Sequence, residues 1–459
     1  MKRLETIKTL FSDRIFLRKT VIIAVPVAAQ ALLNTVTNMI DTMMIGTLGE
    51  TVIAGVGLAN KVFFVFTLLI FGIASGASVL GAQFWGIQDV KNIRKVLGLS
   101  LVLGLLGSLL FTIPSFLAPR LVMGIFTNSA ASGAAGAEYL RLACLSYPFT
   151  AVTNIYVALM RSTERVKTPV VTSLIAILVN ITLNYTLIFG HFGAPALGVT
   201  GAAIATLTAR VVEMLCIFTY VYGWKTPLAA RITELFGYSR ALLKQYVKTV
   251  LPVIGNEFMW GLGVTMYSLA YGRMGDAAVA AITISQTIQD MILVFFQGMS
   301  AAAAVILGNE LGAGRLTDAK RDASRILWLQ LLLTFVLGAV CIFAGNLLVG
   351  IYDVSEEVFR EASLCMLVYG LFMPFKMTNM VNIVGVLRSG GDTRFCLLLD
   401  SGSVWFIGVP MSFLGALVLR LPIHLVFAMT LTEDVVKCFV AHWRYKKYKW
   451  LKNLTVSVS

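Results

Sequence analysis

An acidic residue, Asp41, lies within the apolar stretch VTNMIDTMMIG, which covers residues 36–46. Other polar residues precede it at a spacing that places all of them on one face of an α-helix. This polar face consists of Gln30, Asn34, Thr37, Asn38 and Asp41. A carboxylate flanked by amides and hydroxyls can hold a proton or a small cation, so the face is a candidate ion-binding site.

The cost of a charge inside a membrane restricts where this face can point. A central acidic residue costs roughly 3 kcal/mol even on the lenient insertion scales. The face must therefore line the interior of a helix bundle or a water-filled cavity. Pro26 precedes it, and we expect this proline to kink the helix and to act as a hinge.

A second polar pair occurs in the segment NITLNY, where Asn180 and Asn184 are four residues apart on one helical face. Amide and carboxylate oxygens suit a hard cation such as Na⁺ and equally suit a protonated carboxyl group. The sequence thus predicts a Na⁺ or proton site at Asp41, Asn180 and Asn184, with Thr37 beside them. For the asparagines alone, hydrogen bonding between helices is the alternative.

A third acidic residue, Glu257, lies near Trp260 and Tyr267 in a later apolar segment. An acid beside aromatic rings can bind an organic cation through charge and cation–π attraction. The alternative is an ion pair between Glu257 and Lys61 or Lys376. The wider set of residues that we expect to contact a substrate comprises Asn34, Glu257, Trp260, Tyr267, Gln286 and Asn379.

The remaining charged residues within apolar segments give weaker signals. Arg210 and Glu213 are three residues apart and most simply pair with each other. Asp290 follows Gln286 at helical spacing and suits an ion pair. The sequence alone assigns no role to Asp400.

The composition requires a membrane protein. Hydrophobic residues make up 58% of the 459 residues, and charged residues make up only 13%. Soluble domains carry about 25% charged residues, so the surplus apolar surface must face lipid. No phosphate-binding loop, catalytic triad or cluster of metal-binding residues occurs, which excludes the common enzyme classes. The six cysteines are scattered singly and fit packing roles.

Twelve apolar segments are long enough to cross a bilayer of about 30 Å. In lipid, each must be helical to satisfy its own backbone hydrogen bonds. The predicted fold is therefore an all-α integral membrane protein with twelve transmembrane helices. The segments cover residues 20–45, 52–82, 96–118, 137–160, 168–190, 199–223, 246–271, 277–307, 326–350, 362–387, 395–419 and 423–442.

The net charge of +14 is explained by the distribution of Lys and Arg among the loops. The termini and the even-numbered loops, counted together with Lys248 and Lys437 of the adjoining segments, hold 29 of the 37 basic residues, whereas the opposite loops hold only four: Arg120, Arg273, Arg360 and Arg420. This asymmetry predicts that both termini are cytoplasmic, and it removes the need for a nucleic-acid partner. No cleavable signal peptide is evident. We expect a monomer in the lipid bilayer of the cell membrane.

The chain repeats itself at an offset of 226 residues. Pro26 then aligns with Pro252, and Gly72 aligns with Gly298. After a slip of one residue, Arg161-Ser162 aligns with Arg388-Ser389. The repeat predicts two parallel bundles of six helices, residues 1–230 and 231–459, related by a pseudo-twofold axis. Such repeats are typical of transporters that alternate access to a cavity between their halves.

Several motifs resemble the multidrug and toxic compound extrusion (MATE) family. They are AVPVAAQ (24–30), IDTMMIGTLG (40–49), NITLNYTLIFG (180–190), GVTGAAIAT (198–206), LPVIGNE (251–257) and GVLRSGGDTRF (385–395). The resemblance implies an exporter that exchanges cationic, often aromatic compounds for entering Na⁺ or H⁺, with no cofactor. The positions of Asp41, Asn180, Asn184 and Glu257 match functional positions of the family, and Thr200 is implied to join the amino-terminal site.

Two departures locate the chain within the family. Asn184 stands where some members carry an acid, which is more similar to the NorM-type branch than to the DinF-type branch. Many NorM-type members also carry an acid within 375–380, where this sequence reads FKMTNM. The resemblance therefore favours Asp41 as the coupling residue over any site in the carboxyl half.

Other transport functions remain as alternatives at this point. A flippase for lipid-linked sugars of the same superfamily would be expected to have a more cationic cavity. A channel would show unitary currents. A sugar transporter of the major facilitator type would need a GxxxDRxGRR loop, which GAQFWGIQDVKNIRK (81–95) does not match.

Overall fold

The computed structural model describes residues 13–456, and this part of the chain contains helices and loops but no strands. It divides into two compact units. We call residues 29–254 the amino unit. We call residues 255–459 together with residues 1–28 the carboxyl unit.

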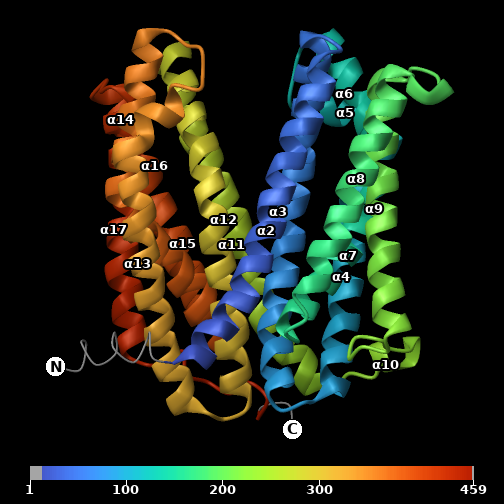
Figure 1. Cartoon of the computed structure of the whole chain (residues 1–459), viewed down its shortest axis with the longest axis vertical. Coiled ribbons are helices and arrows are strands. Elements are labelled where there is room, and N and C mark those ends of the chain that lie inside the picture. The colour runs from blue at the N-terminus through green and yellow to red at the C-terminus, as the bar shows by residue number, and fades with distance from the viewer. Residues whose placement is uncertain (1–12, 457–459) are drawn as a thin grey trace. The chain divides into compact units, whose positions relative to one another are not determined.

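The amino unit contains most of α2 and the helices up to α10, as coloured from blue to green in Figure 1. Their bounds are α2 Arg14–Gly46, α3 Glu50–Gly86, α4 Val90–Leu117, α5 Pro119–Gly124, α6 Ala130–Ala143, α7 Tyr147–Ser162, α8 Lys167–Phe189, α9 Gly198–Gly223 and α10 Ile232–Phe236. Short 3₁₀ turns lie at Cys144–Ser146 and His191–Gly193.

The carboxyl unit begins within α11 and contains the remaining helices. Their bounds are α11 Arg240–Gly272, α12 Asp276–Gly312, α13 Leu316–Val349, α14 Glu356–Asn379, α15 Thr393–Ser403, α16 Val409–Phe413 and α17 Ile423–Lys446. The helical rods around α14 to α16 are continued by π-helical turns, η3 Met380–Leu387, η5 Val404–Gly408 and η6 Leu414–Val418, and by the 3₁₀ turn η4 Arg388–Gly390.

Ten helical segments of the described chain are long and apolar enough to cross a membrane. The two other predicted segments correspond to α11 and α17, which are equally long but carry more polar and charged residues. Large apolar side chains also point outward, such as Phe343 at 86% exposure and Phe406 at 84%. Such side chains suit contact with lipid, and the prediction of an all-α membrane protein is confirmed.

The chain passes from one unit to the other within two helices. Residues of α2 up to Ala28 belong to the carboxyl unit, and residues of α11 up to Ile254 belong to the amino unit. Each change of unit lies two residues after a proline, Pro26 or Pro252. Relative to the predicted division into 1–230 and 231–459, the first half of α2 therefore belongs to the carboxyl unit and the first half of α11 to the amino unit. The predicted division concerns the sequence repeats, and it stays a prediction.

Matching glycines accept the exchanged segments. In the amino unit, a Cβ atom on Gly72 of α3 would lie 2.7 Å from the Cα atom of Ile254. In the carboxyl unit, a Cβ atom on Gly298 of α12 would lie 2.4 Å from the carbonyl oxygen of Ala24. Since both distances are shorter than a van der Waals contact, only glycine permits these close approaches.

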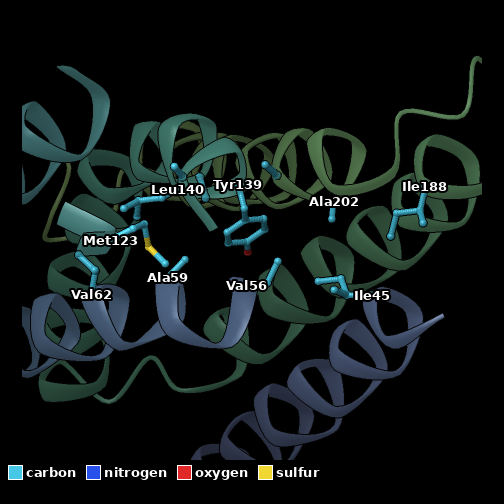
Figure 2. Close-up of a cluster of buried hydrophobic side chains, with 12 residues drawn as sticks. Ile45, Val56, Ala59, Val62, Met123, Tyr139, Leu140, Ile188 and Ala202 are labelled. Carbon is cyan, nitrogen blue, oxygen red and sulfur yellow. The ribbon is translucent and has the colours of Figure 1, made fainter. Parts of the chain in front are cut away.

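A cluster of buried apolar side chains joins α2, α3, α6, α8 and α9 in the amino unit. Figure 2 shows Tyr139 of α6 among Val56 of α3, Ile45 of α2 and Ala202 of α9. Ile45 lies one helical turn after Asp41. This packing therefore fixes the end of α2 that carries the candidate site.

Helices α3 and α6 approach each other closely in this region. A Cβ atom on Gly55 would lie 2.5 Å from the carbonyl oxygen of Ser132 and 2.7 Å from the amide nitrogen of Gly136. A Cβ atom on Gly57, two residues further along α3, would meet no atom within 4 Å. The two glycines thus form a matched pair for testing the contact.

We predict that Gly55→Ala destabilises the protein by about 1–3 kcal/mol, because the added methyl group forces α3 and α6 apart. Gly57→Ala should leave the stability unchanged or slightly raised, because alanine favours a helix over glycine. Thermal unfolding of the purified variants in detergent checks both. Equal midpoints for the two variants would contradict the close packing of α3 against α6.

Candidate cation site and buried charge network

Asp41 meets the two predicted asparagines within the amino unit. The Nδ2 atom of Asn184 on α8 donates to Oδ1 of Asp41 on α2 at 2.6 Å and lies 3.3 Å from Oδ1 of Asn180. The Oδ1 atom of Asn184 is buried and has no hydrogen-bond partner in the described part of the chain. An amide oxygen left free beside a carboxylate is an acceptor available to a proton or a cation.

A small cavity of about 30 Å³ adjoins Asp41. Organic ligands occupy pockets of roughly 300–1,000 Å³, so this cavity fits a water molecule or a small ion only. Its lining comes entirely from the amino unit and comprises Asn34, Thr37, Asn38, Asp41, Ser173, Ala176, Ile177, Asn180, Thr206, Ala209, Arg210 and Glu213.

An ion pair forms part of the wall of the cavity. Arg210 donates to Glu213 at 2.8 Å, which confirms the predicted pairing. Ser173 donates to the other oxygen of Glu213 at 2.9 Å, and Gln30 donates to Ser173 at 2.7 Å. Arg161 in turn donates to Gln30 at 2.5 Å. Glu213 is therefore neutralised by Arg210, whereas the one hydrogen-bond donor that the described residues give to Asp41 is the neutral amide of Asn184.

The two threonines predicted for this site lie in different places. Thr37 lines the cavity, and its hydroxyl group donates to the carbonyl oxygen of Leu33 at 2.8 Å. Thr200 does not line the cavity; its hydroxyl group donates to Glu138 of α6. The structure therefore does not bring Thr200 to the Asp41 site, because the start of α9 is held against α6.

Glu257 is paired with a cation that the sequence did not suggest. The Nη2 atom of Arg388, in η4, lies 3.0 Å from Oε1 of Glu257 on α11, and both residues are buried. The proposed partners Lys61 and Lys376 are therefore wrong. An organic cation would have to displace an internal guanidinium group to reach this carboxylate.

The other residues of the carboxyl unit that were predicted to contact a substrate are either exposed or hydrogen-bonded to acids of α17. Trp260 and Gln286 are exposed on α11 and α12. Tyr267 donates to Glu433 of α17 at 2.9 Å, and Asn379 donates to the side chain of Asp434 at 3.1 Å. Tyr267 and Asn379 thus belong to a buried charge network.

This network joins α11, α14, α15 and α17. The Nζ atom of Lys437 lies 2.8 Å from Asp400, which also accepts from Asn256 at 2.9 Å. Lys376 lies 4.0 Å from Asp434. The network gives a partner to Asp400, which had none from the sequence, and pairs Lys376 with Asp434 in place of Glu257. Lys61 and Asp290 are exposed on α3 and α12.

Sequence reasoning missed the cations of the network. Arg388 and Lys437 were counted with the cytoplasmic loops and the carboxyl tail, but both side chains are buried. A signal was present in the stretch TEDVVK (432–437), where charges at helical spacing interrupt an apolar segment. Buried charges of opposite sign at such spacing indicate an internal ion pair.

One known family model matches this chain in two places. The model of the MatE family matches residues 26–186 and again residues 252–414. The two matches begin at Pro26 and Pro252, which aligned in the predicted repeat. Together they cover more than half of the chain, and their arrangement agrees with a tandem duplication.

Relatives match along nearly the whole chain. The probable multidrug resistance protein NorM of Thermotoga maritima is 26% identical over 86% of this chain and 85% of its own length. A NorM relative from Synechocystis is 28% identical over 85% and 86% of the two chains. The uncharacterized transporter YisQ of Bacillus subtilis is 22% identical over 90% of each.

Solved structures agree on the fold. A crystal structure of a mutant of the Vibrio cholerae MATE transporter VcmN superposes with a TM-score of 0.87 at 18% identity, over 96% of this chain and 98% of that chain. A transporter of the MOP superfamily from Pyrococcus furiosus superposes with a TM-score of 0.85, also at 18% identity, over 96% of each chain. With the family model, these similarities confirm the predicted family: the chain belongs to the MatE family of multi-pass membrane transporters, with a NorM-like sequence.

Proposed function

We propose that the protein is a secondary antiporter that exports organic cations in exchange for an entering proton or Na⁺. The observation that carries this proposal is Asp41, an intramembrane carboxylate that accepts a hydrogen bond from a neutral amide and lies beside a cavity of ion size. The NorM relatives are named probable multidrug resistance proteins, which supports drug-like substrates for this chain. No cofactor is needed, because an ion gradient supplies the free energy.

The coupling ion acts at Asp41 through its charge. When Asp41 is ionised, it attracts a cationic substrate; when a proton or Na⁺ neutralises it, that attraction is lost and the substrate is released. A membrane potential adds about 2.3 kcal/mol per charge per 100 mV to the entry of the ion. Asn180 and Asn184 supply the oxygens that hold the ion, and Thr37 adds a hydroxyl oxygen.

Pro26 is the proposed hinge for the change in access. A proline inside a helix removes one backbone hydrogen bond and favours bending there. The change of unit within α2 lies two residues further on, after Ala28. A bend at Pro26 would thus move the Asp41 segment relative to the first half of the same helix.

We further propose that the protein resides as a monomer in the cell membrane with both termini in the cytoplasm. The excess of Lys and Arg in the termini and the even-numbered loops supports this orientation. The alternative function, transport of a lipid-linked pyrophosphate, would need free cationic groups. Arg388 and Lys437 are instead bound to carboxylates, which favours the export of cations.

We predict that Asp41→Asn abolishes gradient-driven efflux of ethidium from proteoliposomes, because the neutral side chain cannot exchange an ion. Asp353→Asn, in the exposed loop before α14, removes the same charge elsewhere and should transport normally. Imposing a proton gradient or a Na⁺ gradient separately identifies the coupling ion. Efflux by Asp41→Asn with unchanged ion dependence would refute the proposal.

A second prediction separates a structural role of Glu257 from substrate binding. Glu257→Gln leaves Arg388 buried without its counter-charge, which should destabilise the protein by about 3–5 kcal/mol. The double variant Glu257→Gln, Arg388→Met removes both charges and should recover most of the loss. Thermal unfolding in detergent measures the effect. A stable single variant with weakened drug affinity would instead favour direct binding of substrate by Glu257.

A further inference from the structure

Helix α17 carries a group of buried charges that takes no part in the proposed Asp41 site. Glu433, Asp434 and Lys437 lie on neighbouring turns of this helix, and all three are at least nine-tenths buried. Asp400 of α15 and Lys376 of α14 face the same group. All of these residues belong to the carboxyl unit.

The group carries one more negative charge than it has positive charges. Three carboxylates, those of Asp400, Glu433 and Asp434, are opposed by two ammonium groups, those of Lys376 and Lys437. The neighbouring pair of Glu257 and Arg388 balances itself. Because an uncompensated buried charge is costly, one of the three carboxyl groups is best stabilised by binding a cation.

Lys437 already occupies the place that a metal ion would take. Its Nζ atom lies 2.8 Å from Asp400, 3.8 Å from Glu433 and 4.0 Å from Asp434. Another positive ion among the same oxygens would be repelled by this ammonium group. The fitting ligand is therefore a proton, which binds a single carboxylate oxygen.

Glu433 is the carboxylate with the weakest compensation. Asp400 has Lys437 at 2.8 Å and the amide of Asn256. Asp434 has two ammonium groups, those of Lys376 and Lys437, each at 4.0 Å, and the amide of Asn379 at 3.1 Å. Glu433 has one neutral donor, Tyr267, and, among the described residues, one ammonium group within 4.0 Å, that of Lys437 at 3.8 Å.

A buried polar atom without a hydrogen-bond partner also indicates a ligand in this region. The Oδ1 atom of Asn379 is buried and has no hydrogen-bond partner in the described residues, although the same amide group donates to Asp434. An unused acceptor on an amide group that contacts one of the carboxylates suits a carboxyl group that gains a proton and becomes a donor. Asn379 is 3% exposed, so no bulk water replaces that partner.

The elements packed against α17 add few other charges. Asp290 of α12 is exposed and faces Lys376, and Glu361 of α14 pairs with His424 at 2.7 Å. The turns η3, η5 and η6 and helix α16 contain no titratable side chain. The neutral titratable groups near the acids are Tyr267, Tyr271, Tyr369 and Cys438. None of these supplies the missing positive charge.

We infer that Glu433 is a second proton-binding site, which takes up and releases a proton in the carboxyl unit independently of Asp41. Protonation makes the α17 group electrically neutral, and release leaves it with one negative charge. The coupling of this step to drug export rests on the proposed antiport, but the binding of the proton does not.

Infrared difference spectroscopy of the reconstituted protein during a pH titration tests the inference. A protonated carboxylic acid has its own C=O stretching band, and we expect one such band to be lost in Glu433→Gln and kept in Asp41→Asn. The glutamine retains an acceptor for Tyr267, so the fold should persist. A titrating band that remains when Glu433→Gln is combined with Asp41→Asn, or that disappears in Asp434→Asn alone, would overturn the assignment, as would wild-type protein with no such band.

A second variant guards against misfolding of Glu433→Gln. Tyr267→Phe removes the hydrogen-bond donor to the carboxylate and should move the appearance of the same band to higher pH. An unmoved band would overturn the inference. A failure of drug export in any variant would bear on the proposed antiport and leave this spectroscopic result standing.

Discussion

A charge buried in a membrane protein must be neutralised, and this constraint organises both halves of the chain. Water is absent from the bilayer interior, so each carboxylate needs an internal cation, a bound ion or a proton. The two units satisfy this need in different ways. In the amino unit, as far as the structure describes the chain, Asp41 accepts one hydrogen bond, from the amide of Asn184 at 2.6 Å. In the carboxyl unit, Arg388 and Lys437 neutralise Glu257 and Asp400.

The two repeats differ in the partner that each gives to a matching arginine. Arg161 and Arg388 align in the repeat, and each reaches towards the helix that follows the corresponding proline. Arg161 binds the neutral Gln30, whereas Arg388 binds the acidic Glu257. The guanidinium group of the second repeat is thus held by an acid and that of the first repeat by an amide, and Asp41 belongs to neither pair.

Much of the fold could be predicted from the sequence. Apolar length and the need for internal backbone hydrogen bonds predict the helices, and the matching prolines and glycines predict the repeat. The spacing of Asp41, Asn180 and Asn184 also predicts their contact, because each lies on a polar face that lipid excludes. These features are local or periodic, so they are visible without coordinates.

The pairing of distant charges was not predictable in the same way. Glu257 and Arg388 are far apart in the chain, and nothing local indicates which of several cations approaches an acid. Thr200 illustrates the reverse case, since its hydroxyl group binds Glu138 and not the Asp41 site. The exchange of the first halves of α2 and α11 between the compact units was likewise invisible, because it depends on packing at Gly72 and Gly298.

In the proposed antiport, one ion and one cationic substrate compete through Asp41. Calorimetric titration of the purified protein with ethidium tests it most directly, with the pH and the Na⁺ concentration varied separately in buffers of different ionisation enthalpy. Because linkage is reciprocal, we predict that drug binding releases the coupling ion, that raising the concentration of that ion weakens drug binding, and that both effects vanish in Asp41→Asn. Equal ion release and unchanged competition in Asp41→Asn would contradict the account.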